Sequence, residues 1–399
     1  MTNRLDRIDP RELGKRLQSA RKTAGFTQEQ AAQAINVVRT TVVAIERGER
    51  RIRPDELTKL AIAYGQQIAD LIRFSLNAET FSTPQFRGPE EYEGNEQKAQ
   101  IEGCIEKLKD YANDYYELEQ LLDVPTLAKY PEEYSIDGDN IQRIAETLAA
   151  EERHRLHLGD GPVPILRDIL ETDVGLRIYY LPLKPSSYSE IYLFSEQIGG
   201  CIALNSNLPE GRERWSLAHA YAHFLTARRR SIAHVEGFYP ARRLKSEQFA
   251  DEFVRPFLMP AEGLARRFRQ QRQAAGKITA SDLITLAHYY GVSLEAMIYR
   301  LEELELVPTG LQEKLKSGGV RVREVQQQLG LLDIPARRDR LPKRHETLAI
   351  QALREGLINE RRFAALFEIA PEDVEQFYGD SEESIIEPYV EASTEDDER

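Results

Sequence analysis

Two histidines four residues apart carry the clearest chemical signal in the chain. They lie in the pentapeptide His-Ala-Tyr-Ala-His at 219–223. On a helix, residues at i and i+4 lie on one face, so the two imidazoles can bind one cation if a third ligand arrives from another element. The spacing is that of the zinc motif His-Glu-x-x-His, whose glutamate acts as general base. Ala220 stands where that glutamate belongs, so the metal-binding spacing is present and the proton acceptor is absent.

A third metal ligand is available from a second predicted helix, over Lys245–Phe257. Glu247 and Asp251 are four residues apart on this helix, so both carboxylates can face the same site. One of them can bind the metal, while the other accepts the free N–H of a ligand histidine and fixes its tautomer. Glu252 and His234 are weaker alternatives as the third ligand.

The N-terminal segment has the pattern of a helix-turn-helix. A capping box from Thr27 to Gln30 starts the second of its helices, Ile35-Asn36 makes the turn, and Gly48 caps the third. In such an arrangement the third helix enters the major groove of DNA. Five short helices are predicted, over 11–24, 28–34, 38–46, 54–64 and 67–74.

The two histidines must be positioned by the elements between 96 and 304. Apolar periodicity predicts helices over 96–122, 141–156, 163–171, 212–226 and, in two pieces, 278–304. Runs rich in β-formers predict strands over 175–181, 189–194 and 200–204. Residues 77–95 are rich in turn formers and are predicted to be a linker. The apolar stripe of the helix over 96–122 can be a dimer seam, but docking on the next domain is the favoured interpretation because the stripe spans fewer than four heptads.

Composition favours a soluble cytoplasmic protein of several domains. The chain has 399 residues and a net charge of −13, which argues against coating nucleic acid along its whole length. Residues 11–73 nevertheless carry twelve Lys and Arg against seven Asp and Glu, and the last twenty residues are strongly acidic. A small DNA-facing unit on an acidic body is therefore expected. No apolar run reaches the ~18 residues that span a bilayer, and two distant cysteines fit a reducing compartment.

The stretch T-Q-E-Q-A-A-Q-A-I-N-V-V-R-T-T-V-V-A-I-E-R-G-E-R-R resembles the Xre/Cro-type repressors, and the resemblance covers residues 11–73. It implies that Arg39, Thr40 and Thr41 face base edges and that Gln28 contacts a phosphate. It also implies a homodimer on a double-stranded DNA operator. Arg39 can read a guanine in bidentate fashion. The alternative is a helical module that binds only proteins.

The stretch R-E-R-W-S-L-A-H-A-Y-A-H-F-L, followed by E-Q-F-A-D-E-F-V-R-P-F-L-M-P, resembles the ImmA/IrrE metallopeptidases over roughly residues 140–305. Carried over position by position, the resemblance implies that His219, His223 and Glu247 ligate Zn²⁺ and that Asp251 lies in the second shell. Residue 220 is the general-base position. In the family such peptidases relieve repression by cleaving a repressor or partner protein, often in mobile-element, stress or phage-defence settings.

Alanine at position 220 should leave metal binding intact and nearly abolish turnover, because a methyl group cannot accept a proton. General acid–base help of this kind is worth ~10²–10⁴-fold in rate. The alanine is either native, in a pseudo-peptidase that senses zinc or another ligand, or an engineered replacement of glutamate. The intact remainder of the motif favours the engineered origin. We expect the Ala220→Glu variant to regain metal-dependent hydrolysis.

The expected protein is a mainly α, multidomain regulator. The expected function is operator binding joined to zinc-dependent cleavage of a regulatory partner protein in trans, with the partner encoded nearby. The alternatives are a transcription factor whose dead peptidase-like domain senses a metal or ligand, and an antitoxin-like protein that sequesters a partner. The expected parts are a five-helix helix-turn-helix domain (1–74), a linker and long helix (75–136), an α+β zincin-like domain with a small sheet (137–305), a C-terminal helical module (306–379) and an acidic tail (380–399).

Overall fold

The fold was analysed in a computed structural model of the chain. The structure describes residues 10–66, 71, 81–82, 84–87, 95–235, 244–318, 321–331 and 339–377. The chain divides into two compact units: the first comprises Met1–Leu76, Glu117–Asp123 and Thr347–Arg399, and the second Asn77–Tyr116 and Val124–Glu346. Among the described residues, no helix is long and apolar enough to cross a membrane. The predicted mainly α fold with a small sheet is confirmed.

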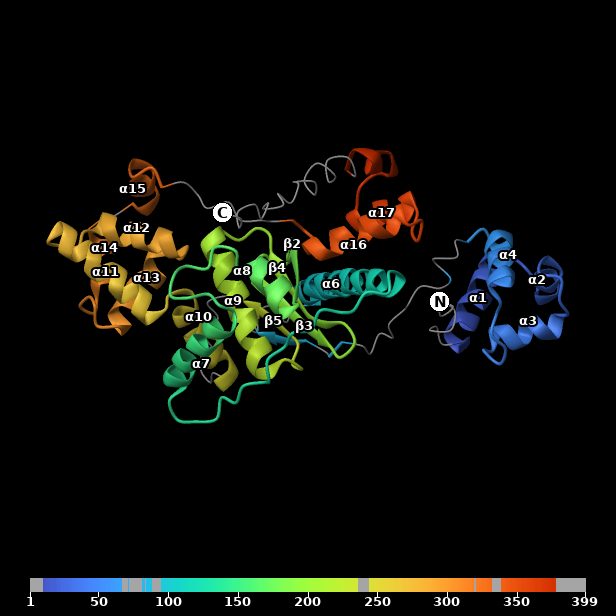
Figure 1. Cartoon of the computed structure of the whole chain (residues 1–399), viewed down its shortest axis with the longest axis horizontal. Coiled ribbons are helices and arrows are strands. Elements are labelled where there is room, and N and C mark those ends of the chain that lie inside the picture. The colour runs from blue at the N-terminus through green and yellow to red at the C-terminus, as the bar shows by residue number, and fades with distance from the viewer. Residues whose placement is uncertain are drawn as a thin grey trace, which may run out of the picture. The chain divides into compact units, whose positions relative to one another are not determined.

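The described residues 10–66, in the N-terminal part of the first unit, form four helices (Figure 1). They are α1 (Pro10–Thr23), α2 (Gln28–Ala34), α3 (Arg39–Glu46) and α4 (Pro54–Tyr64). The predicted capping box is present, since Thr27 accepts from the backbone N–H of Gln30 and the Gln30 side chain returns to the backbone N–H of Thr27. Asn36 has φ 58° in the turn and Gly48 has φ 71° after α3, as the sequence predicts. The predicted fifth helix, over 67–74, lies outside the described residues except residue 71, which is helical.

A five-stranded mixed sheet forms the centre of the second unit. Its order is β1-β5-β3-β4-β2; β1 and β5 run parallel, β3 is antiparallel to both β5 and β4, and β4 is parallel to β2. The strands are β1 (Gln85–Arg87), β2 (Arg177–Leu181), β3 (Tyr188–Ser195), β4 (Gly199–Asn205) and β5 (Ile232–Val235). β2, β3 and β4 match the three predicted strands. The prediction of a plain linker over 77–95 is wrong at β1, and β5 was not predicted.

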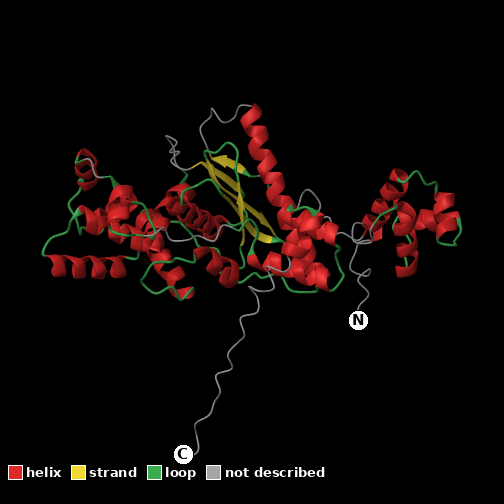
Figure 2. Ribbon diagram, turned by 90° about the horizontal axis from the view of Figure 1, so that it is seen from above, coloured by secondary structure: helices red, strands yellow, loops and turns green. Residues whose placement is uncertain are grey.

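Helices cover both faces of this sheet (Figure 2). Alternate residues of a strand point to opposite faces, and β2 shows which helix each face meets. The hydroxyl of Tyr179 donates to the carbonyl oxygen of Tyr111 on α6 (Asn95–Leu121). The hydroxyl of the next residue, Tyr180, bonds Glu213 on α9 (Glu210–Ala227). The α9 face of the sheet therefore carries the even-numbered residues of β2, together with Tyr192 and Phe194 of β3, which join the same apolar core.

The remaining helices of the second unit lie before and after α9 in the chain. One prediction needs correction: the helix expected over 163–171 is a short α-helix that continues as a single π-helical segment, Leu170–Val174, and stops at Gly175. A Cβ at Gly175 would lie 2.4 Å from the carbonyl oxygen of Leu127, so no other residue fits there. The helices are α7 (Ile141–Arg155), α8 (Leu166–Ile169), α10 (Lys245–Leu258), α11 (Ala261–Ala275), α12 (Ala280–Tyr290), α13 (Leu294–Glu303), α14 (Leu311–Ser317) and α15 (Val322–Gln328).

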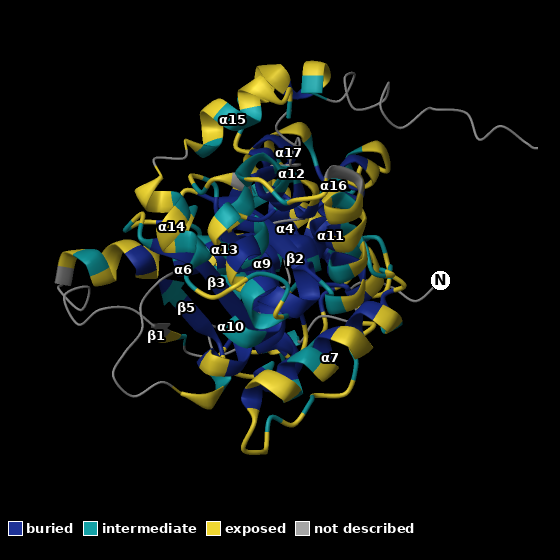
Figure 3. Cartoon of the chain, turned by 90° about the vertical axis from the view of Figure 1, so that its left-hand side faces the viewer, coloured by how far each residue is buried: buried dark blue, intermediate teal, exposed yellow. Residues whose placement is uncertain are grey.

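Burial falls from the sheet outward. The strands β2, β3 and β4 are buried along their whole length, whereas α14 and α15 have no buried residue (Figure 3). Toward the C-terminus, α16 (Lys343–Arg354) and α17 (Glu360–Phe367) lie within the segment predicted to be helical, and a 3₁₀ turn follows at Pro371–Asp373. The predicted acidic tail, 380–399, lies outside the described residues.

Candidate metal centre

The helix α9 carries both motif histidines into the interior of the second unit. His219 and His223 are each only 2% exposed, and their ring centroids lie 4.8 Å apart. The i, i+4 spacing places them one turn apart on the same face, as the sequence predicts. Ala220 is also buried, and its methyl group belongs to the apolar core. The helix therefore divides into an imidazole face and an apolar face, and no acid stands between the two histidines in the motif.

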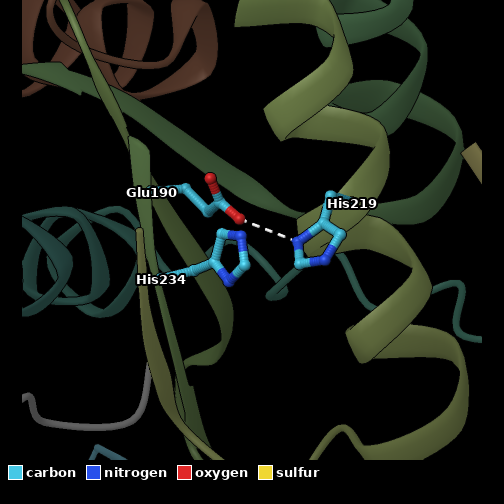
Figure 4. A group of neighbouring side chains, drawn as sticks. All are labelled: Glu190, His219 and His234. Atoms are coloured by element: carbon cyan, nitrogen blue, oxygen red, sulfur yellow. Dashed lines mark hydrogen bonds and ion pairs between the residues drawn. The ribbon is translucent and has the colours of Figure 1, made fainter. Parts of the chain in front are cut away.

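The sheet supplies a buried carboxylate that holds His219 (Figure 4). Oε1 of Glu190, on β3, lies 2.8 Å from Nδ1 of His219, and both side chains are almost fully buried. A carboxylate accepts hydrogen bonds, so we infer that the proton of His219 is on Nδ1 and that the Nε2 lone pair is available to a metal. Burial raises the pKa of Glu190, and the nearby His234 imidazole and Ser189 hydroxyl offset this rise only in part.

The helix α10 brings the predicted carboxylates to the same place. Oε1 of Glu247 lies 3.4 Å from Nε2 of His223, and its Oε2 lies 3.8 Å from Nε2 of His219. Burial by itself would raise the pKa of Glu247, but the close contact with His223 and the other nearby imidazoles outweigh burial and leave the pKa well below its usual range. Glu247 is therefore ionised at neutral pH, as a metal ligand must be.

Asp251 approaches the same edge of His219 as Glu247 does. Its Oδ1 lies 3.5 Å from Nε2 of His219, not from Nδ1. The sequence suggested that one of the two α10 carboxylates would accept the free N–H of a ligand histidine. For His219 that partner is Glu190, which the sequence analysis did not single out. Asp251 remains a predicted second-shell residue on the metal side of the ring.

These donors fit a divalent metal with zinc-like preferences. One ligand atom from each of His219, His223 and Glu247 lies within 4.8 Å of the other two. Zn–N and Zn–O bonds of about 2.1 Å in a regular tetrahedron place neighbouring ligand atoms about 3.4 Å apart. The measured separations of 3.4 and 3.8 Å from Glu247 lie close to that value. The ring nitrogens of His223 are buried, and among the described residues neither makes a hydrogen bond of good geometry. The donor set suits a metal better than a hydrogen-bond network.

A third imidazole borders the site from the sheet. His234 on β5 lies opposite Glu190 on β3 in the strand register, so both side chains project from the same face. Its Nδ1 lies 3.5 Å from Oε2 of Glu247, and burial lowers its pKa to about 4, so the ring is neutral at pH 7. The other alternative ligand from the sequence, Glu252, does not join the site, because its carboxylate pairs with Arg255.

The residues predicted to contact DNA lie together on the helix-turn-helix. Arg39 and Thr40 are exposed at the start of α3, and Thr41 is half-buried beside them. A guanidinium nitrogen of Arg39 donates to Oε1 of Gln28 at 3.3 Å, and Nε2 of Gln28 donates to Glu46 at 2.9 Å.

Glu46 is anchored in turn. It is a buried carboxylate that also accepts from Nε of Arg21 at 2.6 Å. Burial alone would raise the pKa of Glu46, but the hydrogen bonds from Arg21 and Gln28 lower it. A chain of polar contacts thus runs from the core to the exposed end of α3.

Comparisons with known proteins give matches to two family models. The peptidase M78 model, described as the IrrE N-terminal-like domain, matches residues 171–302, and a helix-turn-helix model matches residues 17–71. No curated protein matches the chain.

Two solved structures align with most of the chain, but only loosely. The crystal structure of Bacillus thuringiensis PlcR in complex with the peptide PapR7 and DNA is 12% identical, covers 95% of this chain and all of that chain, and has a TM-score of 0.19. The crystal structure of ComR from Streptococcus suis is 12% identical, covers 94% of this chain and 96% of that chain, and has a TM-score of 0.16. At these TM-scores the likeness carries no argument, so the classification rests on the two family models. The chain therefore carries one segment similar to helix-turn-helix domains, residues 17–71, and a second similar to the peptidase M78 family, residues 171–302.

Proposed function

We propose that the chain is a DNA-binding transcriptional regulator whose IrrE-like domain binds one Zn²⁺ ion. The metal-binding part of this proposal rests on the buried donor atoms of His219, His223 and Glu247, which are spaced as neighbouring ligands of a tetrahedral site are. Glu190 supports it by fixing the tautomer of one ligand. We further propose that this metal site is that of a zinc endopeptidase, which cleaves a regulatory partner protein in trans. With alanine at position 220, the endopeptidase has no turnover.

The chemistry divides between the metal and the protein. A zinc ion at such a site supplies Lewis acidity, which polarises a peptide carbonyl and lowers the pKa of water. Glu190 and the α10 carboxylates hold the imidazoles in orientation, and the apolar core beside Ala220 excludes bulk water. The alanine at position 220 cannot take up a proton, and the absence of a general base lowers the rate by ~10²–10⁴-fold.

Restoring the base tests the peptidase proposal. Ala220→Glu should produce zinc-dependent cleavage of a protein encoded by a neighbouring gene, read by mass spectrometry of the products. The variant should be made alone and also with His234→Ala, which removes the imidazole that the sheet places 3.5 Å from Glu247. If zinc is bound and both variants leave every neighbouring-gene product intact, the peptidase proposal is wrong and the metal proposal stands.

The DNA half of the proposal rests on the helix-turn-helix. Exposed Arg39 and Thr40, with Gln28 beside them, form a polar edge at the start of the helix that enters the major groove. We propose a homodimer on paired half-sites of double-stranded DNA. Selection from random duplexes by the purified chain should yield a palindromic site, and light scattering of the complex should show two chains per duplex. Retention of duplexes without any common sequence would contradict operator binding.

A second candidate is regulation by metal occupancy without cleavage. Two observations favour it: residue 220 is an alanine buried in the apolar core, and His234 stands beside Glu247. In this case, the affinity of the unaltered chain for its operator should change when zinc is added, and no protein should be cleaved. Gel-shift titrations of the metal-free and zinc-loaded chain separate this candidate from the peptidase.

A further inference from the structure

His234 has the position of a metal donor that the two-histidine motif does not contain. Strand β5 pairs with β3 so that His234 lies directly opposite Glu190, on the face of the sheet that α9 covers. The ring centroid of His234 lies 4.3 Å from that of His219 (Figure 4). The α9 and β5 imidazoles therefore approach the site from opposite sides, one from a helix and one from the sheet.

The contacts of His234 point into the metal site. Its Nδ1 lies 3.5 Å from Oε2 of Glu247, which is close to the 3.4 Å between Glu247 and His223. That nitrogen is buried, and it makes no hydrogen bond to any of the residues that the structure describes. With Glu190 and His219, His234 also forms a second set of three donor atoms within 4.8 Å of one another. Two overlapping donor sets thus share His219.

We infer that His234 supplies a fourth protein donor to the ion held by His219, His223 and Glu247, and so closes the site. The inference rests on the metal site proposed above. Four protein donors complete a tetrahedral zinc site and are typical of structural zinc, whereas catalytic sites keep one position open. Closure agrees with the alanine at position 220, because an open position has little hydrolytic use without a general base.

Asp251 is the alternative candidate for the fourth ligand of the metal. Its Oδ1 lies 3.5 Å from Nε2 of His219, but it belongs to neither set of three donor atoms within 4.8 Å. Its side chain is also more exposed than that of His234, 18% against 13%. The geometry therefore favours the imidazole, and the two residues can be compared directly by substitution.

X-ray absorption of the zinc-loaded full-length chain counts the imidazoles on the metal. We expect three in the unaltered chain and two in His234→Ala, with a zinc Kd at least about tenfold higher in chelator competition, since even partners outside the ligand shell are worth 10–100-fold. His154→Ala, an exposed histidine of α7, is the matched control and should change neither reading. Circular dichroism of the metal-free proteins checks that the variants fold.

A second measurement needs no variant. If the site is closed, thiocyanate should leave the visible spectrum of the Co²⁺-loaded chain unchanged, whereas an open position would bind the anion and shift the spectrum. Three results overturn the inference while leaving the metal site in place: two imidazoles in both proteins, a loss of affinity in Asp251→Asn but not in His234→Ala, or two metal ions per chain. Absence of zinc from the unaltered chain would instead overturn the metal proposal itself.

Discussion

The hydrogen bond between Glu190 and His219 provides the sharpest test of how the metal site is built. Its 2.8 Å length and the burial of both side chains mark a charge-assisted bond shielded from water. Glu190→Gln keeps the size and an oxygen acceptor but removes the charge. Losing such a partner costs 10–100-fold in metal affinity. Because glutamine still accepts a hydrogen bond, we expect the lower end, about tenfold or roughly 1.4 kcal/mol. Glu190→Ala loses the bond entirely and should approach 100-fold, about 2.8 kcal/mol.

The assay is competition for zinc between a chromophoric chelator and the full-length chain at neutral pH. Glu196→Gln is the matched control, because Glu196 follows β3 on the surface, where its 69% exposed side chain pairs with Arg229 at 2.7 Å. The control should bind zinc as the unaltered chain does. Unchanged affinity in both Glu190 variants, with intact folding, would refute the role assigned to this carboxylate.

Three further predictions concern the helix-turn-helix and the residue at position 220. Arg39→Ala should weaken binding to the selected operator by about 1–3 kcal/mol, roughly 5- to 150-fold, and relax preference at one base pair; an unchanged affinity in fluorescence anisotropy would remove Arg39 from the interface. The pKa of Glu46 lies below its ordinary 4.5, so its pair with Arg21 stabilises the fold fully above about pH 4.5 and loses that contribution as the pH falls through the folded-state pKa. Glu46→Gln should therefore lower the free energy of unfolding at pH 7 by roughly 3 kcal/mol. It should also weaken the loss of stability at acid pH, measured by urea unfolding at several pH values. A loss of stability at acid pH equal to that of the unaltered chain would contradict this. Ala220→Glu with His234→Ala should hydrolyse protein faster than Ala220→Glu alone, because the second change opens a coordination position; equal rates would argue against closure.

Elements with strong local signals could be predicted from the sequence. The bounds of α2 and α4 agree residue by residue, because Thr27 and Pro54 mark their starts in the sequence. The strands β2, β3 and β4 follow from runs rich in β-formers, and all three are buried along their length. By contrast, β1 and β5 are three and four residues long and exist through pairing with each other, and β5 also pairs with β3, so no local pattern marks them.

The residues of the candidate site also divide into those that the sequence could predict and one that it could not. His219, His223, Glu247 and Asp251 sit at i, i+4 spacing on two helices, and the structure brings all four together. Glu190 was missed because its role depends on how α9 packs against β3, which only the folded structure defines. One signal was available: an acid within the apolar run of a buried strand needs a charged or hydrogen-bonding partner.

The number of zinc ions per chain tests the central claim most directly. Full-length protein, stripped with chelator and reloaded, should retain one zinc by mass spectrometry of the metal after gel filtration. The His219→Ala/His223→Ala double variant should retain none, and His154→Ala should retain one. Retention of zinc by the double variant, or its absence from the unaltered chain, would contradict a metal site built on α9, α10 and the sheet.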